Sequence, residues 1–138
     1  MRLTSFTDYG LRMLMRMASE PQRAFSSGEL ADEFNLSRNH LTKIMQRLAQ
    51  GQIVRTQRGA GGGARLAVKP RELKLGRIVQ LLEQDQPLVE CLSADRGNCT
   101  IDGQCRVKAR LRSAEAAFLR DLDKATLADI ALPTRAPA

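Results

Sequence analysis

Tryptophan is absent from this chain of 138 residues, and aromatic residues make up only 4% of it. Aliphatic residues and methionine must therefore fill the core, and a hydrophobic content of 43% is sufficient to form one. The chain contains no run of about 18 apolar residues, which excludes a membrane-spanning helix. Its first residues are too polar for a secretory signal. We therefore expect a cytoplasmic protein that does not contact a membrane.

Histidine is almost absent as well, because His40 is the only one in the chain. No pair of carboxylates stands near a potential base, and His40 has no suitable nucleophile beside it. General acid–base and nucleophilic catalysis need such groups within reach of one another. We therefore expect that the protein is not an enzyme.

Acidic residues are missing from Phe34 to Lys69, where seven basic residues occur. The chain carries a net charge of +7, and residues 1–69 account for +6 of it. A polyanion such as DNA is a natural partner for this half of the chain. A solvated basic face is the alternative interpretation.

The basic half contains a helix-turn-helix pattern. Apolar residues at helical spacing predict one helix that ends at Phe34, with Ser26 or Ser27 as its N-cap, and a second over 38–50, capped by Ser37. In such a motif the second helix presents its N-terminal residues to the major groove of DNA. The candidate contacts are Ser37, Arg38, Asn39, His40 and Lys43.

Two short strands, Ile53–Thr56 and Leu66–Val68, flank a tip rich in glycine and arginine, which predicts a β-wing. Glycine lets a backbone approach phosphates, and arginine supplies charge or enters the minor groove. The candidate contacts here are Arg58, Gly62 and Arg65. A nucleotide-binding loop is the alternative, but no phosphate-loop lysine motif and no helix follow the tip directly.

The flanking segments predict further helices. The first spans 7–18 with Thr7 as its N-cap, and Asp8 then lies in the first turn, where the helix dipole favours a carboxylate. Another helix lies within 73–82. A long helix over 106–122 carries one apolar stripe that has little to pack on in so small a chain, so we expect a second copy to cover it. Packing onto its own domain is the alternative.

These elements predict a mainly α fold with a small two-stranded β-wing. We expect a winged helix-turn-helix DNA-binding domain over 1–70 and a connecting helix and linker over 71–90. A cysteine cluster loop over 91–105 follows. A dimerisation helix and a C-terminal helix over 106–132 precede a frayed tail over 133–138.

All three cysteines lie in one stretch, as Cys91, Cys99 and Cys105, among residues that favour turns. Thiols so close on a loop can converge on one point. They suit an iron–sulfur cluster that takes its last ligand from elsewhere, or a zinc ion. One disulfide and a free thiol are the alternative, which the reducing cytoplasm disfavours.

The chain resembles the Rrf-type winged-helix regulators of bacteria, and most of all their nitric-oxide-sensing branch. The likeness covers nearly the whole chain and rests on the opening residues 1–12, Leu36–His40, the wing, the three cysteines and residues 118–129. It implies a homodimer that binds a palindromic operator in double-stranded DNA. It also implies one iron–sulfur cluster per subunit.

The resemblance implies a ligand set for that cluster. Cys91, Cys99 and Cys105 correspond to the thiolate ligands of a 4Fe-4S cluster, and Asp8 of the partner subunit corresponds to the fourth ligand. Nitric oxide would be the signal, and operator binding would be lost when the cluster is nitrosylated. An oxygen-labile cluster of this type is readily lost from a crystallised form.

Other signals fit the same scaffold. A sister branch has a histidine ligand three residues after its third cysteine, but Lys108 stands there in this chain, and a charged lysine does not coordinate. A 2Fe-2S cluster is therefore not expected. Iron-responsive or redox-responsive regulation stays an alternative. An electron-transfer iron–sulfur protein is an alternative of another class, against which the basic helix-turn-helix argues.

Overall fold

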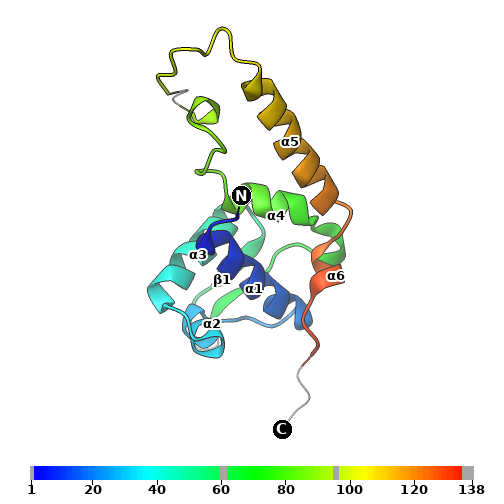
Figure 1. Ribbon diagram of the computed structural model, residues 1–138. Helices are drawn as coiled ribbons and strands as arrows, with labels where there is room; N and C mark the ends of the chain where they lie inside the picture. The colour runs from blue at the N-terminus through cyan, green and yellow to red at the C-terminus, as the bar shows by residue number, and fades with distance from the viewer. Residues whose placement is uncertain (1, 60–61, 95–96, 135–138) are drawn as a thin grey trace.

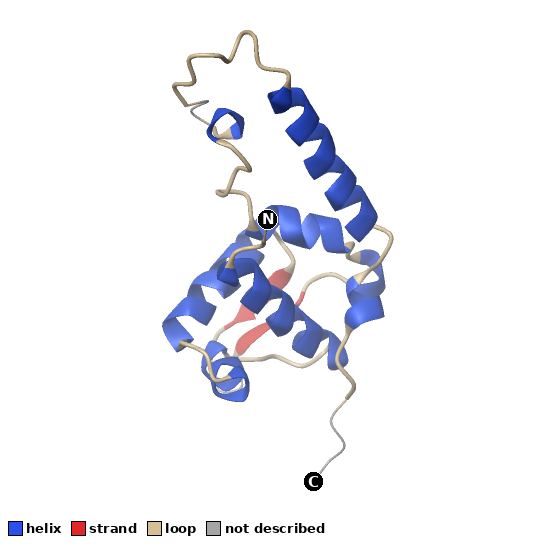
Figure 2. Ribbon diagram, viewed as in Figure 1, coloured by secondary structure: helices blue, strands red, loops and turns tan. Residues whose placement is uncertain are grey.

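The computed structural model describes residues 2–59, 62–94 and 97–134, and helices dominate them (Figures 1 and 2). Within these ranges no helix is both long and apolar enough to cross a membrane. The mainly α fold with a two-stranded wing, as predicted from the sequence, is confirmed. In chain order the elements are α1 (Ser5–Ser19), α2 (Ser27–Phe34), α3 (Arg38–Gln50), β1 (Val54–Gln57), β2 (Gly63–Leu66), η1 (Pro70–Glu72), α4 (Leu75–Leu82), η2 (Glu90–Leu92), α5 (Val107–Leu122) and α6 (Leu127–Ile130).

The first helix, α1, begins earlier than predicted. Thr4 is its N-cap and accepts a hydrogen bond from the Thr7 backbone N–H, so the prediction that Thr7 caps the helix is wrong. A long-range contact fixes this start: the Thr4 backbone N–H and hydroxyl donate to the Glu83 carboxylate at 2.7 and 2.8 Å. The start of α1, with Asp8 in its first turn, is therefore held against the end of α4.

Helices α2 and α3 form the predicted helix-turn-helix. The Ser26 hydroxyl accepts from the Glu29 N–H at 3.0 Å, and the Ser37 hydroxyl accepts from the His40 N–H at 3.3 Å. Both serines therefore cap their helices as predicted. Asn35 joins the helices with a φ of 55°, a left-handed conformation that asparagine tolerates.

The wing strands pair antiparallel, with Arg55 opposite Arg65. Both strands differ from their predicted spans, because β1 begins at Val54 and β2 already at Gly63. A further partner explains the early start of β2: Phe25 and Ala64 exchange two backbone hydrogen bonds of 2.7 Å. A Cβ at Gly63 would lie 2.4 Å from the Phe25 carbonyl oxygen, so this junction requires glycine.

One hydrophobic core joins the winged helix to the segments that follow it. Met13 of α1, Leu41 of α3, Ile78 of α4 and Leu127 of α6 are all fully buried in it. Burying each such side chain contributes about 1.5–3 kcal/mol. Helices α4 and α6 therefore pack on the DNA-binding domain itself rather than forming a separate unit.

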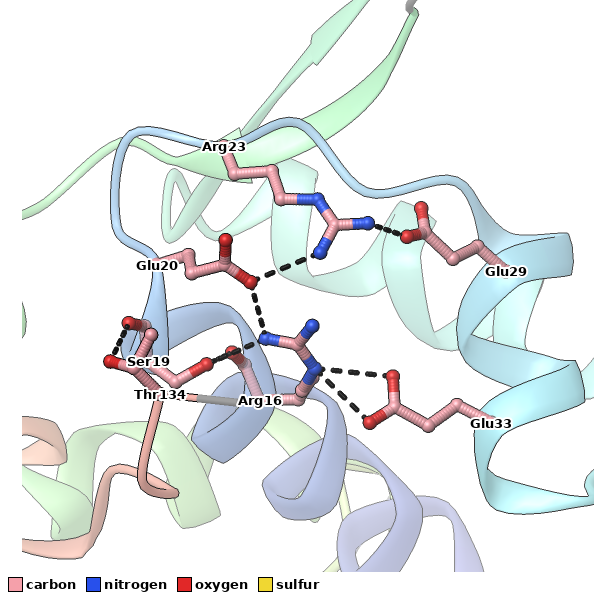
Figure 3. Close-up of polar contacts among 7 residues, drawn as sticks. All are labelled: Arg16, Ser19, Glu20, Arg23, Glu29, Glu33 and Thr134. Carbon is pink, nitrogen blue, oxygen red and sulfur yellow. Dashed lines mark hydrogen bonds and ion pairs between the residues drawn. The ribbon is translucent and has the colours of Figure 1, made fainter. Parts of the chain in front are cut away.

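An ionic network centred on Arg16 ties α1 to α2 (Figure 3). The Arg16 guanidinium is almost closed to water and bonds Glu33 at 3.1 Å and Glu20 at 2.8 Å. It also donates to the Ser19 hydroxyl at 2.7 Å. Hydrogen bonds from Arg16 and then Arg23 hold the pKa of the Glu20 carboxyl below its ordinary value. The network fixes the angle at which the helix-turn-helix meets α1.

Helix α5 and the cysteine loop form an arm that projects from this body (Figure 1). No residue of α5 is buried within the described chain, although α5 packs on α4 at its C-terminal end. Asp123, just after α5, lies so close to Gly76 that a Cβ there would be 2.3 Å from its Oδ1. The arm is thus fixed at its base, where Leu122 packs against the core, while Val107 at the start of α5 is exposed to solvent.

The chain returns to α1 after α6. The Leu132 N–H donates to the Met15 carbonyl at 3.0 Å, and the Thr134 hydroxyl donates to the Ser19 carbonyl at 3.2 Å. The fraying expected for the tail therefore does not extend to residues 133 and 134. Residues 135–138 lie outside the described part of the chain.

Candidate nucleic-acid interface and cysteine loop

The N-terminal part of α3 presents most of the predicted DNA contacts to solvent. Arg38, Asn39 and Lys43 are exposed, and Ser37 is exposed although its hydroxyl caps the helix. His40 is different: its ring is half-buried, 5.3 Å from the Tyr9 ring and 6.0 Å from the Phe6 ring, measured between centroids. The structure thus brings four predicted contacts together on the exposed end of α3 and turns His40 towards α1.

Three further α3 side chains lie on the same side of the helix and were not among the predicted contacts: Thr42, which is half-buried, and Gln46 and Gln50, which are exposed. They follow Arg38 and Asn39 at steps of three and four residues, and this helical spacing could have identified them from the sequence. The Thr42 hydroxyl donates to the Arg38 carbonyl at 2.9 Å, so it is engaged with the helix backbone. Gln46 and Gln50 are exposed and make no side-chain hydrogen bond within the described residues.

The wing carries the remaining predicted contacts. Arg58 is exposed at the end of β1, and Arg65 is half-buried on β2. The Gly62 N–H donates to the Gly59 carbonyl at 2.8 Å and closes the turn at this tip. Positions 60 and 61 of the tip lie outside the described residues. The wing therefore carries two guanidinium groups that are at least partly accessible to solvent.

The cysteine loop runs from η2 to α5, and its three thiols are free. Cys91 and Cys105 are half-buried, whereas Cys99 is exposed. In the described part of the chain, no three His, Cys, Asp or Glu side chains lie close enough to hold one metal ion. The three predicted thiolate ligands therefore do not converge on one site in the described chain.

Two contacts nevertheless draw the cysteine loop together. The Asn98 N–H donates to the Glu90 carboxylate at 3.3 Å, which brings the residue before Cys99 against the residue before Cys91. Gly97, at φ +60°, makes this approach possible, because a Cβ there would lie 2.3 Å from the Glu90 Cγ.

The second contact spans Cys105. The Lys108 ammonium pairs with the Asp102 carboxylate at 3.0 Å, so the residues three before and three after the cysteine are joined. Each end of the loop is therefore held by one of these two contacts.

Asp8 lies on the exposed side of α1 and pairs with Arg12 one turn later. The guanidinium donates two hydrogen bonds to the carboxylate, at 3.1 and 2.9 Å. The Arg12 Cζ also lies 5.4 Å from the centre of the Tyr9 ring, and Tyr9 contacts His40 of α3. A continuous set of contacts therefore runs from the Asp8 carboxylate to the N-terminal half of α3.

A helix-turn-helix with a basic exposed face and a glycine-rich wing defines a class of proteins, the DNA-binding transcription regulators. Comparison with known proteins identifies the family within this class. Residues 3–132 match the Rrf2 family, which is described as iron-dependent transcriptional regulators. The chain belongs to the Rrf2 family.

Individual relatives agree with this assignment. The chain is 39% identical over 133 residues to the transcriptional regulator NsrR of Shouchella clausii, covering 96% of this chain and 89% of that protein. It is 40% identical over 131 residues to NsrR of Bacillus subtilis, covering 94% and 90%. Among solved structures, CymR, the global cysteine regulator of B. subtilis, matches with a TM-score of 0.71 at 25% identity over 95% and 96% of the two chains. The predicted resemblance is confirmed: the chain is an Rrf2-type transcriptional repressor that is similar to NsrR.

Proposed function

We propose that the protein is a homodimeric repressor that binds a palindromic operator in double-stranded DNA and releases it in response to nitric oxide. In this proposal Cys91, Cys99 and Cys105, with Asp8 of the partner subunit, hold a 4Fe-4S cluster. The observation that carries the proposal is the cysteine loop itself, in which three free thiols lie on one segment and the residues before Cys91 and Cys99 contact each other. The similarity to regulators named NsrR supports the choice of signal.

The chemistry of the donors fits such a cluster. Three thiols can each provide a thiolate to iron, and a carboxylate can provide the remaining oxygen ligand. The three thiols are free, so no disulfide has to be broken before a cluster binds. A bound cluster would supply iron atoms that nitric oxide attacks.

The residues of α1 connect such a site with DNA. Asp8 forms a bidentate pair with Arg12 in this structure. Arg12 would therefore bind the Asp8 carboxylate whenever that carboxylate is not a ligand of the cluster. Arg12 lies over Tyr9, and Tyr9 contacts His40 on the helix that faces the major groove. A change in the partner of Asp8 therefore acts on residues that support α3. A difference of about 2–3 kcal/mol between the two states would change operator affinity about 30- to 150-fold.

Dimerisation is part of the proposal because a single chain leaves hydrophobic side chains of the arm exposed. Helix α5 buries no residue within the described chain, and the exposed large hydrophobic side chains include Ile101 and Val107 on the arm and Leu88 just before it. Leu3, at the start of α1, is exposed as well. A second copy related by a two-fold axis would cover these groups and present its own α1 to the cysteine loop.

Iron supply is a second candidate signal on the same scaffold. It is favoured by the description of the Rrf2 family as iron-dependent regulators. In that case the cysteine loop would report whether a cluster can be assembled at all. Operator binding that ignores nitric oxide but is lost on iron depletion would select this candidate.

The test of the proposed function is an anaerobic visible spectrum with iron and sulfide counts, before and after nitric oxide. We expect broad visible absorbance, about four irons per chain and bleaching by nitric oxide. The Asp8→Ala variant should hold a less stable cluster, whereas Asp32→Ala, which removes an exposed carboxylate from α2, should behave as the wild type. A colourless protein that holds zinc or no metal would overturn the proposal.

A further inference from the structure

A shallow hollow of about 410 Å³ lies between α3 and the wing. Thr42, Gln46 and Gln50 of α3 form one rim, and Gln57 of β1 contributes to the other. Its lining contains no acidic and no basic side chain, although it lies within the most basic part of the chain. A neutral hollow within a basic face is suited to a neutral group of a polyanion rather than to a phosphate.

The floor of the hollow is apolar. Met45 and Ala64 are buried beneath it and Ala49 of α3 borders it. A methyl group entering the hollow would therefore lose contact with water and gain contact with carbon atoms. In the major groove, thymine presents a C5-methyl group, and side-chain methyl and methylene groups make the apolar contact that recognises it.

The α3 side chains differ in what they are free to contact. Arg47 bonds Asp85 at 2.7 Å, and the Thr42 hydroxyl is engaged with the helix backbone. Gln46 lies between them in sequence, is exposed, and its amide makes no hydrogen bond within the described residues. The carbonyl oxygen of such an amide can accept a hydrogen bond from the N6 amino group of adenine, and its NH2 group can donate one to N7, which together form a bidentate contact.

We propose that Gln46, at the rim of the hollow between α3 and the wing, determines operator specificity by binding the major-groove edge of an A·T base pair. The Gln46 amide contacts adenine, and the apolar floor receives a thymine methyl group. The flanking arginines Arg38 and Arg58 contact phosphates and contribute affinity without selecting a sequence. This inference rests on the proposed binding of an operator, and its test separates the two.

The test uses full-length protein, purified without oxygen, and a library of random DNA duplexes. Wild-type protein should select duplexes with a fixed A·T pair that recurs once in each half-site. Gln46→Ala should lose the preference at that pair, reducing discrimination there by about 5- to 150-fold while leaving the other positions unchanged. Gln80→Ala removes an equally exposed glutamine from α4 and should select the same duplexes as the wild type.

Modified bases test the contact atom by atom. Replacing the selected adenine by 7-deazaadenine should weaken wild-type binding but not the binding of Gln46→Ala, and replacing the thymine by uracil should weaken both. If wild-type protein selects no duplex, operator binding itself fails. If it selects duplexes and Gln46→Ala retains every preference, the role of Gln46 is overturned and the proposed function stands.

Discussion

The Tyr9 ring meets the His40 imidazole edge-on, with centroids 5.3 Å apart and ring planes at 75°. This contact joins α1 to α3, and α1 also carries the Asp8–Arg12 pair. The first helix therefore connects two proposed functional regions, the fourth ligand of a cluster and the helix that we propose to enter the major groove of DNA.

Replacing Tyr9 by leucine should weaken the coupling between the cluster and DNA. The change removes the edge-on ring contact with His40 but keeps an apolar side chain on α1. We expect the ratio of operator affinities between cluster-loaded and cluster-free protein to fall. Tyr9→Phe retains the ring and should keep the wild-type ratio in the same fluorescence anisotropy titrations. An unchanged ratio in Tyr9→Leu would show that coupling bypasses this contact.

Gly97→Ala should reduce the amount of cluster that the protein holds. A Cβ at this position conflicts with the Glu90 side chain and with a φ of +60°, so the segment before Cys99 cannot approach Cys91 as it does here. Gly103→Ala is the matched control in the same loop, because a Cβ there meets nothing within 4 Å. Iron and sulfide counts after anaerobic reconstitution measure the effect. Equal counts in the two variants would contradict it.

Arg16→Leu should destabilise the fold by about 2–4 kcal/mol. The change removes the contacts with three polar partners, Ser19, Glu20 and Glu33, from a site that is almost closed to water, and breaking such a buried ionic site is costly. Arg12→Leu removes an ion pair whose side chains are about half exposed and should cost less than about 1 kcal/mol. Urea denaturation of the three proteins compares them, and similar midpoints for both variants would refute this account of the network.

The stability that Glu20 contributes should depend on pH. Hydrogen bonds from Arg16 and then Arg23 lower the pKa of its carboxyl in the folded protein. A carboxyl with a lowered pKa stabilises the fold above its unfolded pKa, and this contribution is lost as the pH falls through the folded pKa. The urea midpoints of wild type and Glu20→Gln should therefore differ at neutral pH and converge in acid. A difference that persists at low pH would argue against this assignment.

Much of the secondary structure in the N-terminal half could be predicted from short stretches of sequence. Ser26 and Ser37 cap their helices as predicted, because capping depends on a few adjacent residues. The start of α1 and the span of β2 were not predictable in this way. Each is decided by a partner far along the chain, Glu83 for Thr4 and Phe25 for Ala64.

The candidate site was predictable in composition but not in arrangement. The sequence identified the three cysteines and the basic residues of α3 and the wing. It did not indicate that His40 turns towards α1, because Tyr9 and Phe6 lie more than 30 residues earlier. Gln46 was not predicted as a contact because the prediction relied on charge and a glutamine side chain is neutral. Its position beside the hollow also depends on how the wing packs against α3.

The most direct test of the central claim is the affinity of the anaerobic, cluster-loaded dimer for a selected operator duplex, measured before and after stoichiometric nitric oxide. The account predicts tight, salt-sensitive binding that weakens about 30- to 150-fold after nitric oxide, and no such change in a protein that lacks Cys99. Binding that is equally tight before and after nitric oxide, while the cluster bleaches, would contradict the claim that the cysteine loop controls the DNA-binding helix.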